Sequence, residues 1–341
     1  MTTSAAPDGK GGEKSARGVA WGRRLTGSSI FIAYALVVLS FVAGEIAMPG
    51  FAKFGHIMTV LQSAFFLGMV TLGQMIVLVS GREGIDLSVG AIFTMGVVVS
   101  ASVIGGNNAM IIPAVLVVLA LGFGLGLVNG LGVALLGIAP LIMTLGWGIA
   151  VEGIAYFSTG GFLPGRASPI LETVSGKSMD MSIGSSRLAI PYLVPIWLLI
   201  ATAAVVAMSR TRAGFVLYAT GANERTARLV GVRTRMVIAL SYAVSGMFAA
   251  LAGLFMLGYV GRPNLGLGNR YILPSVVSAI IGGVALSGGA GSYAGAAAGA
   301  VFLTSLISIL TTLGLGESAR QMIVGAVLIL LLISYARKPK A

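Results

Sequence analysis

The stretch LVSGREGIDLSVGAIF, residues 78–93, places three charged side chains between two long apolar runs. These runs cover about 57–79 and 88–104, and each is close to the ~20 residues that an α-helix needs to cross a bilayer. Because only 9% of the chain is charged, the group of Arg82, Glu83 and Asp86 stands out. The pattern of run, turn and run predicts two consecutive membrane helices joined by a short polar turn.

Composition extends this pattern to the whole chain. Of its 341 residues, 57% are hydrophobic, and the mean hydropathy is +0.98. A soluble core does not need that much apolar surface, whereas a bilayer does. The apolar segments are continuous and do not alternate with a period of two, which disfavours a β-barrel. We therefore predict an all-α fold, a polytopic membrane helix bundle that forms one domain.

Ten apolar runs are candidates for transmembrane helices. The fourth is rich in glycine, so we expect that helix to tilt, bend or break. The ten runs are about 30–48, 57–79, 88–104, 110–136, 140–158, 192–208, 236–258, 271–288, 293–313 and 320–336.

An even number of spans puts both termini on the same side, and the positive-inside rule assigns that side. With the N-terminus inside, fifteen of the 22 Lys and Arg residues fall in cytoplasmic segments. This excess predicts about 10 transmembrane helices with both termini cytoplasmic. The predicted division is a disordered basic cytoplasmic tail at 1–27, a transmembrane domain at 28–336 and a second cytoplasmic tail at 337–341.

Glycine spacing predicts how the helices pack. Small residues that repeat every four positions form a stripe on one helix face, which lets neighbouring backbones approach closely in lipid. Such stripes indicate tightly packed central helices rather than a binding site. The two sets are Gly122, Gly126 and Gly130 in GFGLGLVNGLG, and Gly291, Gly295 and Gly299 in GAGSYAGAAAGA.

Several function classes are excluded by the sequence. The chain has no cysteine and one histidine, His56, so neither a disulfide nor a metal site is expected. SGKS at 175–178 ends like a phosphate-binding loop, but that motif needs a glycine where this chain has Leu171. A Ser/His/Asp triad is not plausible with one histidine at the edge of an apolar run. Cytoplasmic loops account for the net charge of +12, so nucleic acid is not an expected partner.

The longest cytoplasmic connection, residues 209–235, contains a short predicted helix. Asn223 can cap the N-terminus of this helix, and Gly231 can end it. Glu224 and Arg228 are spaced i,i+4 and can form an ion pair on its surface. A helix fixed between two spans is a suitable lever for an attached cytoplasmic subunit. An ordinary solvated basic loop is the alternative. The candidate coupling residues are Gly221, Asn223, Glu224, Arg225, Arg228 and Gly231.

The turn at 81–90 is predicted to be a capped turn at the inner surface. Asp86 precedes the third span, where its carboxylate can accept hydrogen bonds from free N–H groups and meet the positive end of the helix dipole. Arg82 then needs no partner in the membrane, and Glu83 is its solvated neighbour. A partly related stretch, SGGAGSYAG at 287–295, falls at a corresponding inner turn and suggests two related halves. The candidate gate residues are Gly84, Asp86, Ser88 and Gly90.

Several motifs together resemble the permease subunits of bacterial ABC importers for ribose and related monosaccharides, in the branched-chain amino acid/ribose permease superfamily. GIDLSVG at 84–90 resembles the most recognisable motif of that family, and ATGANERTARLVGV at 219–232 resembles its coupling segment. SYAVSGMFAALAGL at 241–254 and GGVALSGGAGSYAGAAAGA at 282–300 resemble blocks of its later spans, and 144–161 matches more loosely. The resemblance covers about 30–336 without large insertions.

The resemblance implies the protein's role and its partners. The expected role is that of a non-enzymatic transport subunit in the bacterial inner membrane that imports a monosaccharide or sugar-like solute by alternating access. A second permease copy would pair with it among membrane lipids, a cytoplasmic ABC ATPase would hold ATP and Mg²⁺, and a periplasmic solute-binding protein would deliver the solute. No cofactor is expected in this chain itself.

Two departures from the family pattern leave the sugar open. The family usually reads Gly-Gly-Ile-Asp-Leu-Ser, whereas Glu83 replaces the first glycine here and follows Arg82. In the block at 144–161, Glu152 stands where a basic residue is expected. Glu152 either faces a cavity or a partner inside the membrane, or lies at a wet outer interface.

Uncharged polar side chains inside the spans suit the path of a neutral solute, and Trp147 offers a stacking surface. Any single buried Gln or Asn more often only hydrogen-bonds a neighbouring helix. The candidate translocation path is Gln62, Gln74, Asn129, Thr144, Trp147 and Glu152, and Ser63 and Tyr156 are further polar residues of this kind.

Two other functions remain open at this point. One is an ion- or proton-coupled secondary carrier, although such proteins usually place several acids or histidines inside their spans. The other is a membrane scaffold without transport activity.

Overall fold

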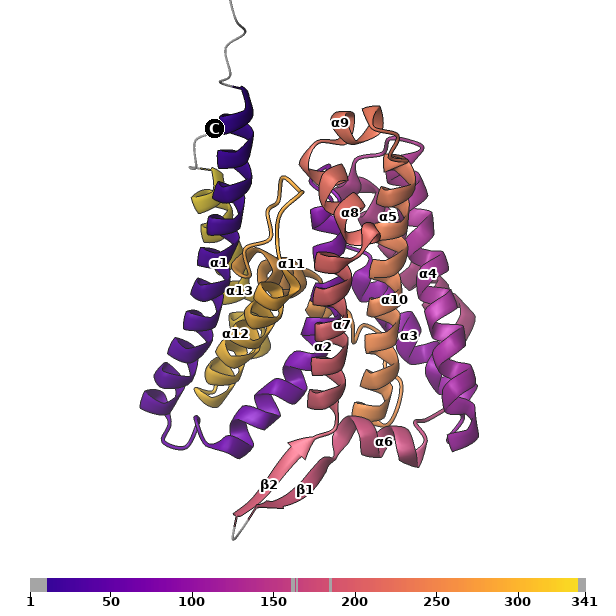
Figure 1. Cartoon of the computed structure of the whole chain (residues 1–341). Coiled ribbons are helices and arrows are strands. Elements are labelled where there is room, and N and C mark those ends of the chain that lie inside the picture. Colours follow the sequence, from indigo (N-terminus) through magenta and orange to yellow (C-terminus); the bar gives the residue numbers. More distant parts are fainter. Residues whose placement is uncertain (1–10, 161–162, 164, 184–185, 337–341) are drawn as a thin grey trace, which may run out of the picture.

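The computed structural model describes residues 11–336 except 161–162, 164 and 184–185 (Figure 1). Side chains are described from residue 29 onward, except at 181–187, 331–332 and 334–336. Residues 1–10 of the tail predicted at 1–27 lie outside these residues, and so does the whole tail predicted at 337–341. Helix α1 already begins at Gly11, so residues 11–27 are helical although the sequence predicts disorder there.

Each of the ten predicted runs contains one helix, which confirms the all-α membrane bundle. Seven helices of the described chain are long and apolar enough to cross a bilayer: α1, α2, α4, α5, α7, α10 and α12. The number of spans and the side of the termini stay predictions. The ten helices are α1 (Gly11–Ala47), α2 (Phe54–Val79), α3 (Val89–Ile104), α4 (Ile111–Ala134), α5 (Pro140–Thr159), α7 (Leu193–Arg210), α10 (Thr234–Val260), α11 (Ile272–Ile281), α12 (Tyr293–Thr312) and α13 (Glu317–Ala336).

Short elements connect the long helices. Strands β1 and β2 form an antiparallel hairpin, with Ser178 paired to Pro191, in the loop that follows α5. The sequence did not predict this hairpin. The short elements are η1 (Asn108–Met110), α6 (Pro169–Gly176), β1 (Ser178–Ile183), β2 (Ser186–Pro191), α8 (Arg212–Ala222), α9 (Glu224–Leu229) and η2 (Asn269–Tyr271).

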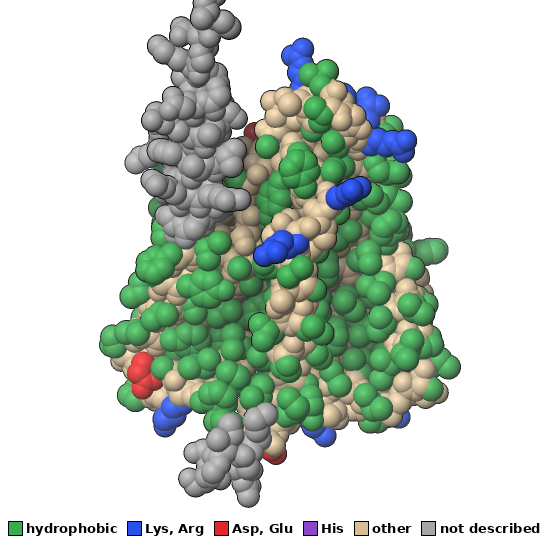
Figure 2. Space-filling model, in the orientation of Figure 1, with side chains coloured by type: hydrophobic (Ala, Val, Ile, Leu, Met, Phe, Trp, Pro, Cys, Tyr) green, Lys and Arg blue, Asp and Glu red, His purple; other side chains and the backbone are tan. Residues whose placement is uncertain are grey.

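The bundle has two distinct ends. Helix α9 lies at one end, here the α9 end, together with the start of α1 and the end of α13, while the β-hairpin marks the opposite, hairpin end (Figure 1). Lys and Arg side chains gather around the α9 end, and hydrophobic side chains cover the sides (Figure 2). Exposed apolar residues such as Phe31, Ile112 and Leu199 fit contact with lipid.

Helix α11 corrects the predicted run at 271–288. It ends at Ile281, because Gly282 and Gly283 follow and the backbone at Gly283 takes a left-handed φ of +84°. The rest of the run forms a loop that returns toward the α9 end (Figure 1).

The glycine stripe on α4 packs directly on α10, as predicted. A Cβ atom on Gly122, Gly126 or Gly130 would collide with a backbone carbonyl oxygen of α10. The second stripe is shorter than predicted. Gly295 and Gly299 of α12 lie against Gly282 and the α11 backbone in the same way, whereas Gly291 lies before α12 in a loop, with φ +145°.

This contact predicts a large stability difference between two alanine variants of one helix. Gly126→Ala would press a methyl group into the carbonyl of Tyr242, an overpacking that costs about 1–3 kcal/mol. Gly124 has open space where its Cβ would lie, so Gly124→Ala is the matched control. We expect Gly126→Ala to lower the Tm of the detergent-purified protein by several degrees and Gly124→Ala to leave it unchanged or slightly raised. Equal Tm values for the two variants would contradict the close packing of α4 on α10.

Candidate functional site

The predicted coupling helix exists as α9. The side chain of Asn223 accepts a hydrogen bond from the N–H of Thr226 at 2.9 Å, which confirms the cap. Gly231 ends the turn with φ +88°, and Arg228 pairs with Glu224 as predicted, at 2.5 Å. Arg225 is exposed.

Gly221 has a different position from the other residues of the predicted coupling segment. It lies near the end of α8, and a Cβ there would collide with the carbonyl oxygen of Val79. Helix α8 is therefore packed directly onto the end of α2.

Arg82 is exposed, as predicted, but it has a partner that the sequence did not predict. Its guanidinium forms a two-pronged ion pair with Glu224, with Nε–Oε2 and Nη2–Oε1 both 2.8 Å, and its Nη1 donates to the carbonyl of Val133 at 3.0 Å. Glu83 is exposed and makes no ion pair within the described residues. The sequence analysis missed this pair because the partner of Arg82 is 142 positions away.

Because of this ion pair, the Glu224 carboxylate stays ionised over a wide pH range. The hydrogen bonds from Arg82 lower the pKa of the Glu224 carboxyl to about 2 from its ordinary 4.5, against the smaller opposing effect of burial. Thr234 also donates to this carboxylate, at 3.2 Å. Glu224 thus joins α9 to the turn after α2 and to the start of α10.

Two other backbone segments meet this turn. Arg82 and Glu83 both have positive φ, +57° and +52°, a conformation that costs energy for residues with a side chain. Gly81 contacts Gly221, and Gly288 of the loop at 282–292 packs against both. The N–H of Gly289 donates to the carbonyl of Val79 at 3.0 Å. The two predicted inner turns therefore touch each other beside α8.

Asp86 lies inside the protein, whereas Arg82 and Glu83 of the same turn are exposed. Its side chain is completely buried. Oδ1 accepts from the N–H and the hydroxyl of Ser88, at 3.0 and 2.6 Å, and Oδ2 accepts from the hydroxyl of Ser245 at 3.0 Å. Asp86 does accept an N–H just before α3, as a capping residue would, but it also reaches across to α10.

Three residues of the predicted path join this network. The Gln74 carboxamide, with its oxygen toward the N–H of Asp86 and its nitrogen toward the C=O, satisfies both at 3.1 Å. Asn129 Nδ2 donates to Ser88 Oγ at 2.6 Å, and Thr144 Oγ1 accepts from the N–H of Leu87 at 3.1 Å. The buried polar network, defined as Gln74, Asp86, Ser88, Asn129, Thr144 and Ser245, thus connects α2, α3, α4, α5 and α10.

Gly84 and Gly90 lie on either side of the network, at two positions where a larger side chain would not fit easily. A Cβ on Gly84 would lie 3.0 Å from the carbonyl oxygens of Gly81 and Val77, and one on Gly90 would lie 2.6 Å from the side chain of Ile272. These two glycines allow residues 84–90 to pass through the packed interior.

The other path candidates lie elsewhere. Gln62 donates to the carbonyl of Ser175 at 2.9 Å and so fastens α6, and Trp147 Nε1 donates to the carbonyl of Leu125 at 2.9 Å. Glu152 is half-buried, and its Oε1 accepts from Asn269 of η2 at 3.3 Å. These three residues do not contact the buried polar network through any hydrogen bond of the described chain.

Comparison with known proteins finds clear similarity. Residues 26–332 match the family described as branched-chain amino acid transport system / permease component. The galactose/methyl galactoside import permease protein MglC of Escherichia coli is 33% identical over 278 residues, which cover 75% of this chain and 80% of that protein. The ribose import permease protein RbsC of E. coli is 32% identical over 305 residues, with 88% and 90% covered. The fructose import permease protein FruF of Bifidobacterium longum is 29% identical over 286 residues, with 83% and 78% covered. No solved structure matches.

The ion pair predicts a pH-dependent coupling between two residues far apart in sequence. Because the pKa of Glu224 is lowered on folding, the pair stabilises fully above pH 4.5 and loses its effect as the pH falls toward about 2. We expect Arg82→Gln and Glu224→Gln each to lower the Tm at pH 7, and the double variant to be no worse than either. The coupling should be about 1 kcal/mol, because both side chains are partly exposed.

The controls for this cycle are Glu83→Gln at pH 7 and the single variants at pH 3.5. Glu83→Gln should leave the Tm unchanged, and the difference between wild type and Glu224→Gln should shrink at the lower pH. Additive losses in the double variant, or a difference that grows at low pH, would contradict the pair.

Asp86 should tolerate asparagine far better than alanine. An asparagine oxygen can keep both bonds from Ser88, and its amide can donate to a rotated Ser245 hydroxyl. Alanine leaves the buried donors without an acceptor, at a cost of about 1–3 kcal/mol for each unsatisfied group. We expect the Tm of Asp86→Ala to fall clearly below that of Asp86→Asn in the purified protein. Equal values would show that the bonds to Asp86 add nothing to stability.

Proposed function

Because the chain belongs to the family of permease components of branched-chain amino acid transport systems, we propose that it is the membrane subunit of an ATP-driven importer of a monosaccharide or sugar-like solute. The observation that carries this proposal is the similarity to RbsC, which extends over 88% of this chain. MglC and FruF, which are named for galactose and fructose import, support the sugar class over an amino acid. An ion- or proton-coupled carrier is not favoured by these relatives.

The α9 end is the proposed docking surface for a separate ATPase subunit in the cytoplasm. Leu229 and Val230 are 81% and 75% exposed there, beside the basic side chains of Arg225 and Arg228. Neighbouring exposed apolar side chains with polar residues around them are typical of a surface that binds another protein. The ATPase would bind ATP and Mg²⁺, and this chain would supply the lever.

The segment at 81–88 is the proposed route from this lever to the membrane interior. Arg82 binds Glu224 on α9, and four residues later Asp86 holds the buried polar network. A shift of α9 would pull the segment, and the network would pass that shift to the five helices it connects. This arrangement suits alternating access driven from the cytoplasm.

The remaining proposed partners follow from the same assignment. A second permease copy would complete the transporter in the lipid of the inner membrane. A periplasmic solute-binding protein would dock at the hairpin end. Both proposals rest on the names of the relatives as import permeases.

Uptake measurements test the function. We expect cells with this chain and its ATPase to accumulate labelled ribose, galactose or fructose, to stop when the ATPase is deleted, and to continue in the presence of an uncoupler that leaves ATP intact. Uptake by the chain alone, driven by an ion gradient in ATP-free vesicles, would show a secondary carrier instead. Growth and uptake unchanged by deletion of the chain would show a scaffold.

The docking surface is tested with Leu229→Asp. We expect this variant to lose co-purification of the ATPase and at least about tenfold of the uptake rate, because Leu229 lies on the surface and supports nothing inside the chain. Ile170→Asp changes an exposed apolar residue on the short helix α6 at the opposite end. It is the control for ATPase co-purification alone, because the solute-binding protein is proposed to dock at that end. Normal ATPase binding by Leu229→Asp would rule out this docking surface.

A further inference from the structure

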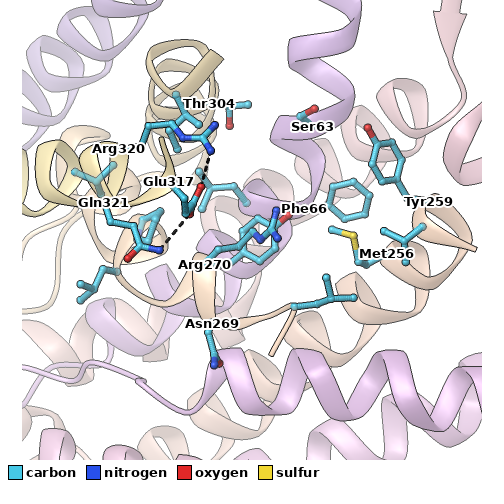
Figure 3. A pocket seen from close by; sticks show the side chains of 18 residues that line it. Ser63, Phe66, Met256, Tyr259, Asn269, Arg270, Thr304, Glu317, Arg320 and Gln321 are labelled. Carbon is cyan, nitrogen blue, oxygen red and sulfur yellow. Dashed lines mark hydrogen bonds and ion pairs between the residues drawn. The ribbon is translucent and has the colours of Figure 1, made fainter. Parts of the chain in front are cut away.

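A cavity of about 600 Å³ opens between the ends of α2, α10, α11, α12 and α13 (Figure 3). Its residues come from the ends of these helices and from η2, opposite to α9. The volume falls within the range of small-molecule sites. The lining residues that matter here are Ser63, Phe66, Tyr259, Arg270, Glu317 and Arg320.

The cavity reaches well into the bundle. Ser63 lies nine residues after the start of α2, which at 1.5 Å per residue is roughly 14 Å along the helix. Thr304 lies eight residues before the end of α12, roughly 12 Å along it. Both residues line the cavity, so it extends from the hairpin end into the membrane-spanning layer.

Two of the three charged groups in the wall neutralise each other. Glu317 pairs with Arg320 at 2.8 Å, and Gln321 donates to the same carboxylate at 3.1 Å (Figure 3). Arg320 also contacts the hydroxyl of Thr311. Arg270 is exposed and makes no ion pair among the described residues, so it is the one unpaired charge of this lining. A neutral ligand leaves the pair of Glu317 and Arg320 intact.

One hydroxyl of the wall has unused hydrogen-bonding capacity. The hydroxyl of Ser63 makes no hydrogen bond within the described chain. A ligand rich in hydroxyl groups can bond to it, because each hydroxyl donates and accepts.

Aromatic rings form another part of the wall. The rings of Phe66 and Tyr259 meet edge to face with centroids 5.4 Å apart, and Tyr271 lies nearby in the lining. Ring faces and edges suit the apolar C–H surface of a sugar, whose hydroxyl rim would face Ser63 and Arg320.

We propose that this cavity binds the transported solute, a neutral polyhydroxylated molecule of monosaccharide size that enters from the hairpin end. The proposal rests on the proposed import function and adds the site within it. The site is separate from the buried polar network: Tyr259 and Ser245, both on α10, are fourteen residues or roughly 21 Å apart. Glu152 touches the edge of the site through Asn269.

The test compares variants that fill or strip the cavity in cells that contain the complete transporter. Ser63→Phe fills the deep end, and Tyr259→Ala removes the ring. The transported sugar is first identified by uptake of ribose, galactose and fructose in the wild type. We expect Ser63→Phe to lower its uptake at least about tenfold and Tyr259→Ala to lower it at least about fivefold. The membrane level of the chain and its co-purification with the ATPase should not change.

Matched controls make the same changes on exposed helix surfaces away from the cavity. Thr202→Phe on α7 and Tyr34→Ala on α1 should keep uptake within about twofold of wild type. Normal uptake by both cavity variants would overturn the site while leaving the import function in place. If the wild type takes up none of the three sugars, the proposed function fails and the site with it. Faster uptake of galacturonate, which is an anion, than of galactose would contradict the proposal that the ligand is neutral.

Discussion

Residues 84–88 are non-helical backbone inside a membrane bundle, and such backbone must find its hydrogen-bond partners inside the protein. Gln74 satisfies the backbone of Asp86, Thr144 satisfies the N–H of Leu87, and Asp86 satisfies that of Ser88. The positions of α2, α3, α5 and α10 are therefore fixed around one segment. The network has the character of structural support, and the solute path is better sought in the cavity at the other end of α10.

The sequence predicted those features that depend on composition and on neighbours along the chain. Apolar runs located the helices, Asn223 and Gly231 bounded α9, and glycine spacing identified the contact of α4 with α10. Features that depend on distant partners were missed. Arg82 pairs with Glu224, which is far away in sequence, and nothing near Asp86 in the sequence indicates its bond from Ser245.

The candidate path shows the same limit. Gln74, Asn129 and Thr144 were grouped correctly as buried polar residues, but pattern alone could not separate side chains that support backbone from those that meet a solute. Ser63, named for the same reason, does line the cavity. The sequence analysis singled out neither Arg320 nor Glu317, since their position between the helix ends is set by how α12 and α13 pack.

Helix α11 has ten residues and spans roughly 15 Å, about half the ~30 Å of a bilayer core. The remaining depth on the α9 side is occupied by the loop at 282–292, which meets the turn after α2 and the end of α8 through Gly81, Gly221, Gly288 and Gly289. Surfaces made of bare backbone have no interdigitated side chains to disengage when they separate. A Cβ atom on Gly221 or Gly288 would collide with backbone atoms there, so these three segments can come this close only while both positions remain glycine.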